Sequence, residues 1–119
     1  MTAILEPTAV ATDAWVDVCA TGDLVPDRGV CALVDGRQVA IFRTSWGDLF
    51  AVDNADPFSG ANVMSRGIVG SRGEVPKVAS PMYKQSFDLR TGRCLDDPSV
   101  SLPVYPVRER VGRIEVAVP

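Results

Sequence analysis

Apolar and polar residues alternate along most of the chain, which is the pattern of half-buried β-strands. In the first half of the chain, the alternation predicts strands over residues 15–18, 30–34, 37–42 and 49–52. Asp35-Gly36 lies between the second and third of these strands, and this pair favours a two-residue hairpin turn because both positions need a positive φ. We therefore expect residues 30–53 to form a three-stranded antiparallel meander.

Turn-forming residues interrupt the alternation between residues 54 and 67, which predicts a loop with at most one short helical turn around residues 61–65. A second loop is expected over residues 80–85. Between the loops, Pro76 lies in the extended segment 75–79 and lacks a backbone N–H. We expect this proline to exclude its position from a central ladder of the sheet.

The remaining strands are short and are expected at residues 68–69, 75–79, 86–89, 104–108 and 113–118. Thr91-Gly92 and Gly112 provide turns between them. Short strands without a convincing long helix predict one all-β domain, an antiparallel β-sandwich or small barrel. We expect this domain to span residues 15–119, after a flexible N-terminal tail over residues 1–14.

Three cysteines and no histidine are the most informative features of the composition. The absence of histidine excludes Ser/His and Cys/His catalysis, imidazole general bases and histidine-containing metal sites. Cys19, Cys31 and Cys94 are too widely spaced for a CxxC motif, and their apolar neighbours predict buried side chains. Unpaired thiols, no basic leader and no long apolar stretch predict a cytoplasmic protein without a membrane segment.

Charge is distributed unevenly along the chain. The net charge of −3 gives no support for nucleic-acid binding. Residues 1–60 carry three basic and nine acidic groups, whereas the segment 66–93 carries six basic groups against Glu74 and Asp88. Two interpretations remain open: this segment is a solvated loop surface, or it docks an acidic partner or a phosphate-bearing ligand.

The two predicted loops and the strand after them contain short motifs in a recognisable order. These are Asp56-Pro57-Phe58-Ser59-Gly60, Ser80-Pro81-Met82-Tyr83, Phe87-Asp88 and Thr91-Gly92. The arrangement resembles the Rieske-type iron–sulfur domain, in which a Cys-x-His-x-Gly loop and a Cys-Pro-x-His loop hold a [2Fe–2S] cluster. The resemblance implies a Rieske-like fold with two loops at the former cluster site.

The resemblance also assigns the four cluster-ligand positions of that family. Its cysteines fall on Asp56 and Ser80, and its histidines fall on Phe58 and Tyr83. None of these residues is a cysteine or a histidine, so we expect no metal and no iron–sulfur cluster on this chain. A ferredoxin-like electron carrier is therefore the least favoured function.

Further motifs narrow the resemblance, and they run in order along the chain: Ser65-Arg66-Gly67-Ile68-Val69, Ala79-Ser80-Pro81, Thr91-Gly92-Arg93-Cys94 and Tyr105-Pro106-Val107-Arg108. Together they are similar to small subunits of cytoplasmic NAD(P)H-dependent assimilatory nitrite reductases. That family implies a non-redox accessory subunit, with FAD, siroheme and a [4Fe–4S] cluster on a large catalytic subunit that reduces nitrite to ammonium. The alternative is a free-standing Rieske-like domain that binds a protein or a small molecule.

No residue of the chain is predicted to be catalytic, and the site hypotheses concern structure and docking. We expect Asp56 to cap its loop, and Ser80 and Tyr83 to form polar contacts with it that tie the two loop tips together. Phe58 is expected to fill the former cluster cavity with apolar surface. The candidates for docking onto a larger subunit are Arg66, Lys84 and Arg90.

Overall fold

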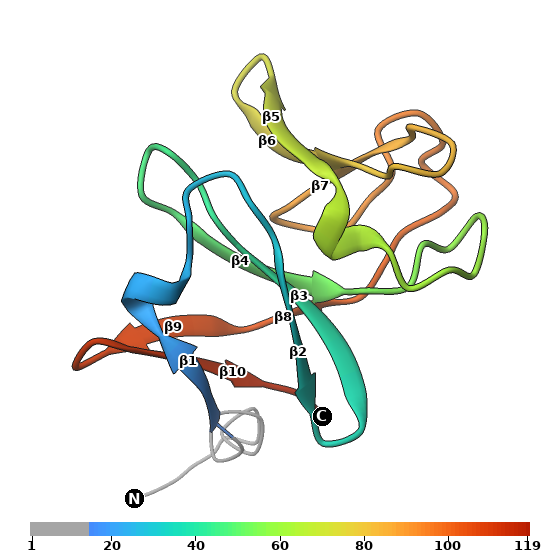
Figure 1. Cartoon of the computed structure of the whole chain (residues 1–119). Coiled ribbons are helices and arrows are strands. Elements are labelled where there is room, and N and C mark those ends of the chain that lie inside the picture. The colour runs from blue at the N-terminus through green and yellow to red at the C-terminus, as the bar shows by residue number, and fades with distance from the viewer. Residues whose placement is uncertain (1–14) are drawn as a thin grey trace, which may run out of the picture.

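The structure, a computed structural model, describes residues 15–119, so the predicted N-terminal tail over residues 1–14 lies outside the described residues. Short strands dominate it (Figure 1). In chain order the elements are β1 (Trp15–Ala20), η1 (Thr21–Asp23), β2 (Val30–Val34), β3 (Arg37–Arg43), β4 (Leu49–Asp53), η2 (Met64–Arg66), β5 (Ile68–Arg72), β6 (Val75–Ala79), β7 (Ser86–Asp88), β8 (Val104–Tyr105), β9 (Val107–Arg110) and β10 (Arg113–Ala117). The two helical elements are single 3₁₀ turns, and no helix among these residues is long and apolar enough to cross a membrane.

The strands form three antiparallel sheets with the orders β1-β10-β9, β2-β3-β4-β8 and β5-β6-β7. The predicted meander is confirmed, because β2, β3 and β4 are neighbours in the second sheet. Asp35 and Gly36 both have positive φ, at 49° and 80°, as the two-residue hairpin turn requires. The all-β prediction is therefore confirmed, and the sheets remain open rather than closing into a barrel.

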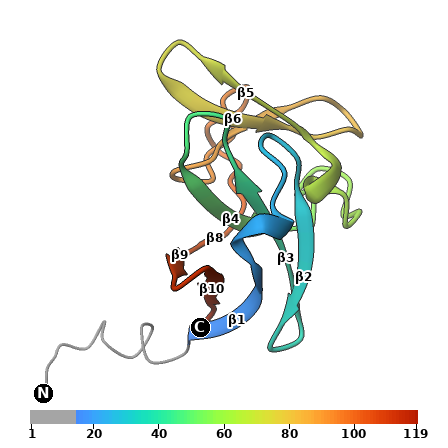
Figure 2. The ribbon, with the colours of Figure 1, turned by 60° about the vertical axis from the view of Figure 1, so that its left-hand side comes forward.

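Two apolar cores lie on opposite faces of the second sheet. Along β3, Val39 and Ile41 belong to the core shared with the first sheet, whereas Ala40 and Phe42 belong to the core shared with the third sheet. This alternation follows from the two-residue period of a strand. In Figure 2 the third sheet lies at one end of the molecule, the first at the other and the second between them. β3 therefore contributes to both cores.

Two sequence predictions about individual residues of the strands are wrong. Cys31 was expected to be buried, but its side chain is exposed, because it lies on the edge strand β2 and the core that buries its partner Ala40 does not extend over it. Pro76 was expected to avoid a central ladder, yet it lies on β6, the central strand of the third sheet. The Pro76 carbonyl accepts a hydrogen bond from Leu89 N–H, one residue beyond the end of β7. The nitrogen of Pro76, which has no N–H to donate, therefore faces the part of the chain just beyond β7, where that strand has already ended.

The boundaries of some elements also differ from prediction. The strand expected over residues 104–108 is divided at Pro106 into β8 and β9, which belong to different sheets. Pro106 suits the point of division between β8 and β9 because its missing N–H interrupts the ladder. The helical turn expected around residues 61–65 is displaced to η2, over residues 64–66.

Candidate functional site

The first loop that carries the family resemblance is a compact six-residue turn that begins at Asp56. The Asp56 N–H donates to the Ala61 carbonyl over 2.8 Å, and the Gly60 N–H donates to the Asp56 carbonyl over 2.7 Å. Asp56 Oδ1 accepts a hydrogen bond from the Phe58 N–H at 2.8 Å, which confirms the predicted capping role of this carboxylate. The fifth residue, Gly60, has a φ of 76°.

The second loop repeats this arrangement, beginning at Ser80. The Ser80 N–H donates to the Gln85 carbonyl over 2.9 Å, and the Lys84 N–H donates to the Ser80 carbonyl over 3.0 Å. Ser80 Oγ accepts from the Met82 N–H at 3.2 Å. The fifth residue is again left-handed, but here it is Lys84, with a φ of 65°. The two loops therefore share one backbone design.

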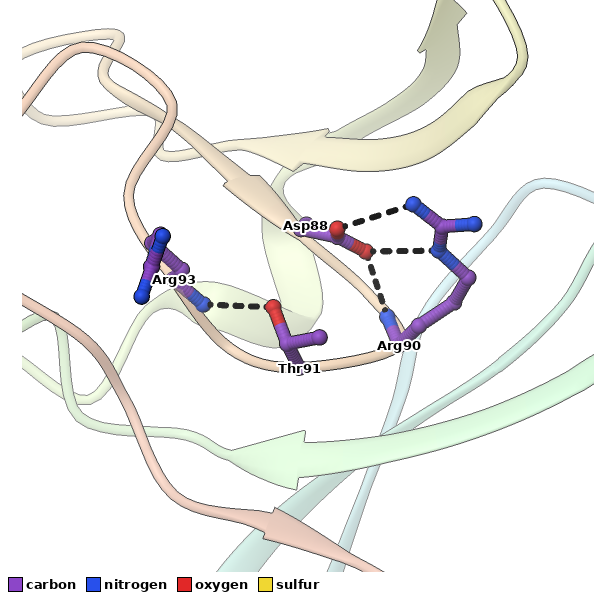
Figure 3. Close-up of polar contacts among 4 residues, drawn as sticks. All are labelled: Asp88, Arg90, Thr91 and Arg93. Atoms are coloured by element: carbon purple, nitrogen blue, oxygen red, sulfur yellow. Dashed lines mark hydrogen bonds and ion pairs between the residues drawn. The ribbon is translucent and has the colours of Figure 1, made fainter. Parts of the chain in front are cut away.

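The same design occurs a third time, directly after β7. Asp88 Oδ1 accepts from the Arg90 N–H at 2.8 Å, the Gly92 N–H donates to the Asp88 carbonyl over 2.7 Å, and Gly92 has a φ of 82°. Figure 3 shows the Arg90 guanidinium folded back onto the Asp88 carboxylate, with Nε–Oδ1 at 3.2 Å and Nη2–Oδ2 at 3.1 Å. Burial raises the pKa of the Asp88 carboxyl, but hydrogen bonds from Arg90 outweigh burial, so the pKa lies below its usual value.

A buried hydrogen bond joins the first residues of the first two loops. Ser80 Oγ donates to Asp56 Oδ2 over 2.6 Å, and the two residues are 1% and 0% exposed. The predicted link between the loops is confirmed for this pair. The prediction is wrong for Tyr83, whose side chain is 62% exposed. Ser80 is held at the base of its loop by the backbone bonds, while Tyr83 lies on the exposed part of the same turn.

Phe58 lies beside these residues and is partly buried. Its side chain packs against the core shared by the second and third sheets. The centroids of the Phe58 and Phe87 rings are 6.1 Å apart, and the ring planes are tilted by 47°. This geometry is favourable for an aromatic pair, so Phe58 covers core surface beneath the loop.

The residues of the two loops do not fit a Rieske cluster. Such a cluster needs two cysteine thiolates and two neutral imidazoles, and the chain has no histidine. Cys19 and Cys31 lie in β1 and β2, and Cys94 follows the third loop, so neither cluster loop contains a cysteine. Within residues 15–119, no three Cys, Asp or Glu side chains gather as a metal site. The direct Ser80–Asp56 hydrogen bond also occupies the place between the loop bases.

The predicted docking residues lie in two different places. Ile68, the first residue of β5, pairs with Ala79, the last of β6. Arg66, which precedes β5, and Lys84, which follows β6, therefore lie at the same end of this hairpin. Arg90 comes after β7, at the strand end opposite to Lys84, and is engaged by Asp88. The structure therefore separates Arg90 from the other two candidates, and docking by any of the three stays a prediction.

Arg90 lines two adjoining surface grooves that the sequence analysis did not identify. One groove has a volume of about 400 Å³ and is lined by Trp46, Phe50 and Pro76, among others. The other has a volume of about 540 Å³ and includes Phe50 and Tyr105. In the sequence, each copy of the repeated loop begins with an aspartate or a serine and has a glycine or a lysine four residues later. This spacing was a signal for the loop. No local signal indicated the grooves, because they form between separate sheets.

Comparisons with known proteins agree with this geometry. The Rieske-like [2Fe-2S] domain family matches residues 14–117. The nitrite reductase (NADH) small subunit of Escherichia coli K12 is 41% identical over 103 residues, covering 86% of this chain and 95% of that protein. A crystal structure described as an NADH-dependent nitrite reductase small subunit from Mycobacterium tuberculosis is 57% identical, with a TM-score of 0.86 over 88% of this chain and 95% of that one.

A third relative is much longer than this chain. The NAD(P)H nitrite reductase large subunit of Klebsiella oxytoca is 38% identical over 109 residues, which is 91% of this chain but 11% of that protein.

The family match, the open antiparallel sheets and the paired loops together define the class of the protein: it is a Rieske-like domain whose loop residues do not fit a cluster. Within that class, the chain belongs to the family of nitrite reductase small subunits.

Proposed function

We propose that the chain is the small, non-redox accessory subunit of a cytoplasmic NAD(P)H nitrite reductase, which reduces nitrite to ammonium in nitrate and nitrite assimilation. The observation that carries the proposal is the extent of the similarity to nitrite reductase subunits. It covers 95% of the Escherichia coli small subunit and a 109-residue stretch within the Klebsiella oxytoca large subunit. Because that relative contains a homologous region in the same polypeptide as the large subunit, we infer that the two proteins form one assembly.

The chemistry of the loops supports an accessory role rather than an electron-transfer role. The side-chain oxygens of Asp56 and Ser80 form hydrogen bonds with backbone N–H groups and with each other. Phe58 contributes apolar packing. These residues hold the two loops in a fixed relative position and supply no redox group, so we propose that FAD, siroheme and the [4Fe–4S] cluster are carried by the large subunit.

The test is gentle purification of the tagged chain from cells that also express the large subunit. Recovery of a flavin- and haem-bearing large subunit is expected, and the tag alone serves as the control. The small subunit purified by itself should be colourless and contain no stoichiometric iron. Failure to recover the large subunit would favour the free-standing binding module, and a reddish-brown protein with two irons would overturn the non-redox assignment.

A further inference from the structure

The backbone of the second loop carries a residue that its own geometry disfavours. All three copies of the loop need a positive φ at their fifth position, and two of them place glycine there, Gly60 and Gly92. The second loop places Lys84 at the same position, with a φ of 65°. A side chain in this left-handed region costs energy that glycine avoids. A strained residue that persists where the same loop elsewhere uses glycine points to a function of its side chain.

The surroundings of Lys84 show what that function is. Lys84 and Arg66 are exposed, and neither forms an ion pair among the described residues. From Pro57 to Gln85 the chain contains one acidic residue, Glu74. Glu74 lies in the turn between β5 and β6, at the opposite end of that hairpin from Ile68 and Ala79. The exposed charges of this segment at the loop end are therefore positive, and Asp96, which accepts a hydrogen bond from the Ser86 N–H there, is already paired with Arg72.

Large apolar side chains are exposed at the same end of the molecule. Ile68, Met82 and Tyr83 have exposed fractions of 72%, 46% and 62%. Ile68 pairs directly with the residue before Ser80, and the Ser80–Asp56 bond fixes this loop against the first one. Figure 1 shows both loops on the right-hand side of the molecule, and Figure 2 shows them on one side again. Apolar side chains beside unpaired cations on a rigid base are typical of a protein-binding surface.

We propose that this end of the molecule is the surface that binds the large subunit. The surface, called the loop-tip surface below, consists of Arg66, Ile68, Met82, Tyr83 and Lys84. Its partner is an apolar face of the large subunit bordered by carboxylates, because the two charged residues of this surface, Arg66 and Lys84, are exposed cations without an ion pair. Tyr83 and Ile68 are the apolar anchors, and Lys84 is held in its strained conformation to present its ammonium group to a carboxylate. The inference rests on the proposed function, since the occupant is the large subunit.

Substitution of Lys84 by glycine separates binding from folding. Lys84→Gly reproduces the sequence choice of the other two loops, so its melting temperature should equal or exceed that of the parent. Its affinity for the purified large subunit should fall roughly fivefold, and the loss should shrink as salt is raised. Lys84→Arg keeps the charge and should bind like the parent. Tyr83→Ser should weaken binding by roughly tenfold or more.

Val111 provides the matched control. It also has a positive φ, 51°, and is 95% exposed, but it lies in the turn between β9 and β10 in a different sheet. Val111→Gly and Arg110→Ser should leave the affinity unchanged. Parental affinity in both Lys84→Gly and Tyr83→Ser, or losses confined to the control variants, would overturn the loop-tip surface. If the parent chain itself fails to bind the large subunit, the proposed function fails, and this surface fails with it.

Discussion

At the scale of single residues, the Asp56–Ser80 hydrogen bond has the largest structural consequence in the candidate site. A buried carboxylate is costly unless its oxygens accept hydrogen bonds. Asp56 meets this requirement with one backbone donor and one hydroxyl donor, and both bonds are shorter than 2.9 Å. The pair therefore links two loops that are 24 residues apart in the chain without any metal ion.

Removal of the hydroxyl tests this link. Ser80→Ala leaves Asp56 Oδ2 buried without that donor, so the free energy of unfolding should fall by about 1–3 kcal/mol. Urea denaturation would measure the change. Ser71→Ala, at an exposed serine of β5, is the control and should change stability by less than about 0.5 kcal/mol. Equal effects of the two substitutions would contradict the role given to the Ser80 hydroxyl.

The ion pair of Asp88 and Arg90 makes part of the stability depend on pH. Because the pKa of Asp88 is lower in the folded state than in the unfolded state, the folded protein binds fewer protons in acid. The contribution of this carboxylate is present above its unfolded pKa, about 4, and is lost as pH falls through the lower folded pKa. Asp88→Asn should therefore destabilise the protein at pH 7, and its difference from the parent should shrink near the acid limit.

Chemical denaturation of the parent and of Asp88→Asn at a series of pH values would measure this difference. Arg90→Ala removes the partner of the carboxylate and should show the same convergence at low pH. A gap between parent and variant that stays constant down to the acid limit would show that the ion pair does not produce the pH dependence.

Residue-scale features were only partly predictable from the sequence. The capping role of Asp56 followed from its residue type in a turn-rich segment, and the structure confirms it. Its contact with Ser80 was correct, but the same hypothesis placed Tyr83 there as well. A hydroxyl group indicates the capacity to form a hydrogen bond, whereas the backbone path of the loop decides which of two hydroxyls reaches the partner. Cys31 was misjudged for a similar reason, because an apolar neighbourhood does not reveal whether a core extends as far as the edge strand.

At the scale of elements, the three copies of the loop differ in how closely other segments approach them. A Cβ added to Gly92 would lie 2.0 Å from the Leu102 carbonyl oxygen, whereas one added to Gly60 would meet no atom within 4 Å. Both glycines have a similar positive φ. A side chain at either position would therefore adopt an unfavourable left-handed backbone conformation. Only at Gly92 would it also clash with another segment of the chain.

Alanine at the two glycines separates these contributions. Gly60→Ala should cost about 1–2 kcal/mol, which is the penalty of a left-handed residue with a side chain. Gly92→Ala adds a clash with backbone and should cost more than about 3 kcal/mol. Thermal unfolding of both variants would show the order. Similar losses in the two variants would mean that the segment at Leu102 moves aside freely.

The strands themselves were the most predictable elements. Alternation and the Asp35-Gly36 turn located β2, β3 and β4 to within about one residue, because both signals are local. The division of the last region into β8 and β9 was missed, since it depends on which sheet each half joins as well as on Pro106. The central position of Pro76 was missed because the end of β7 is set by the third loop. Non-local pairing explains each of these errors.

At the scale of the whole molecule, β3 couples the two cores. Val39 and Ile41 face one core and Ala40 and Phe42 face the other, and all four residues are fully buried. Loss of order in either core exposes one face of this strand. The two halves of the molecule should therefore unfold together, as small single domains usually do.

The two tryptophans allow this coupling to be tested, because they report on different regions. Trp15 lies in β1, and the Arg108 Cζ atom is 4.1 Å from the centroid of the Trp15 ring. Trp46 lines a groove that Pro76 of β6 also lines. Phe42→Ala empties space in the core shared with the third sheet and should cost about 3–5 kcal/mol. In single-tryptophan versions, both probes should show the same lowered midpoint. Leu33→Ala, at a side chain that is 73% exposed on β2, should change neither midpoint appreciably. If Phe42→Ala lowers the midpoint at Trp46 but leaves that at Trp15 in place, the cores unfold independently and β3 does not couple them.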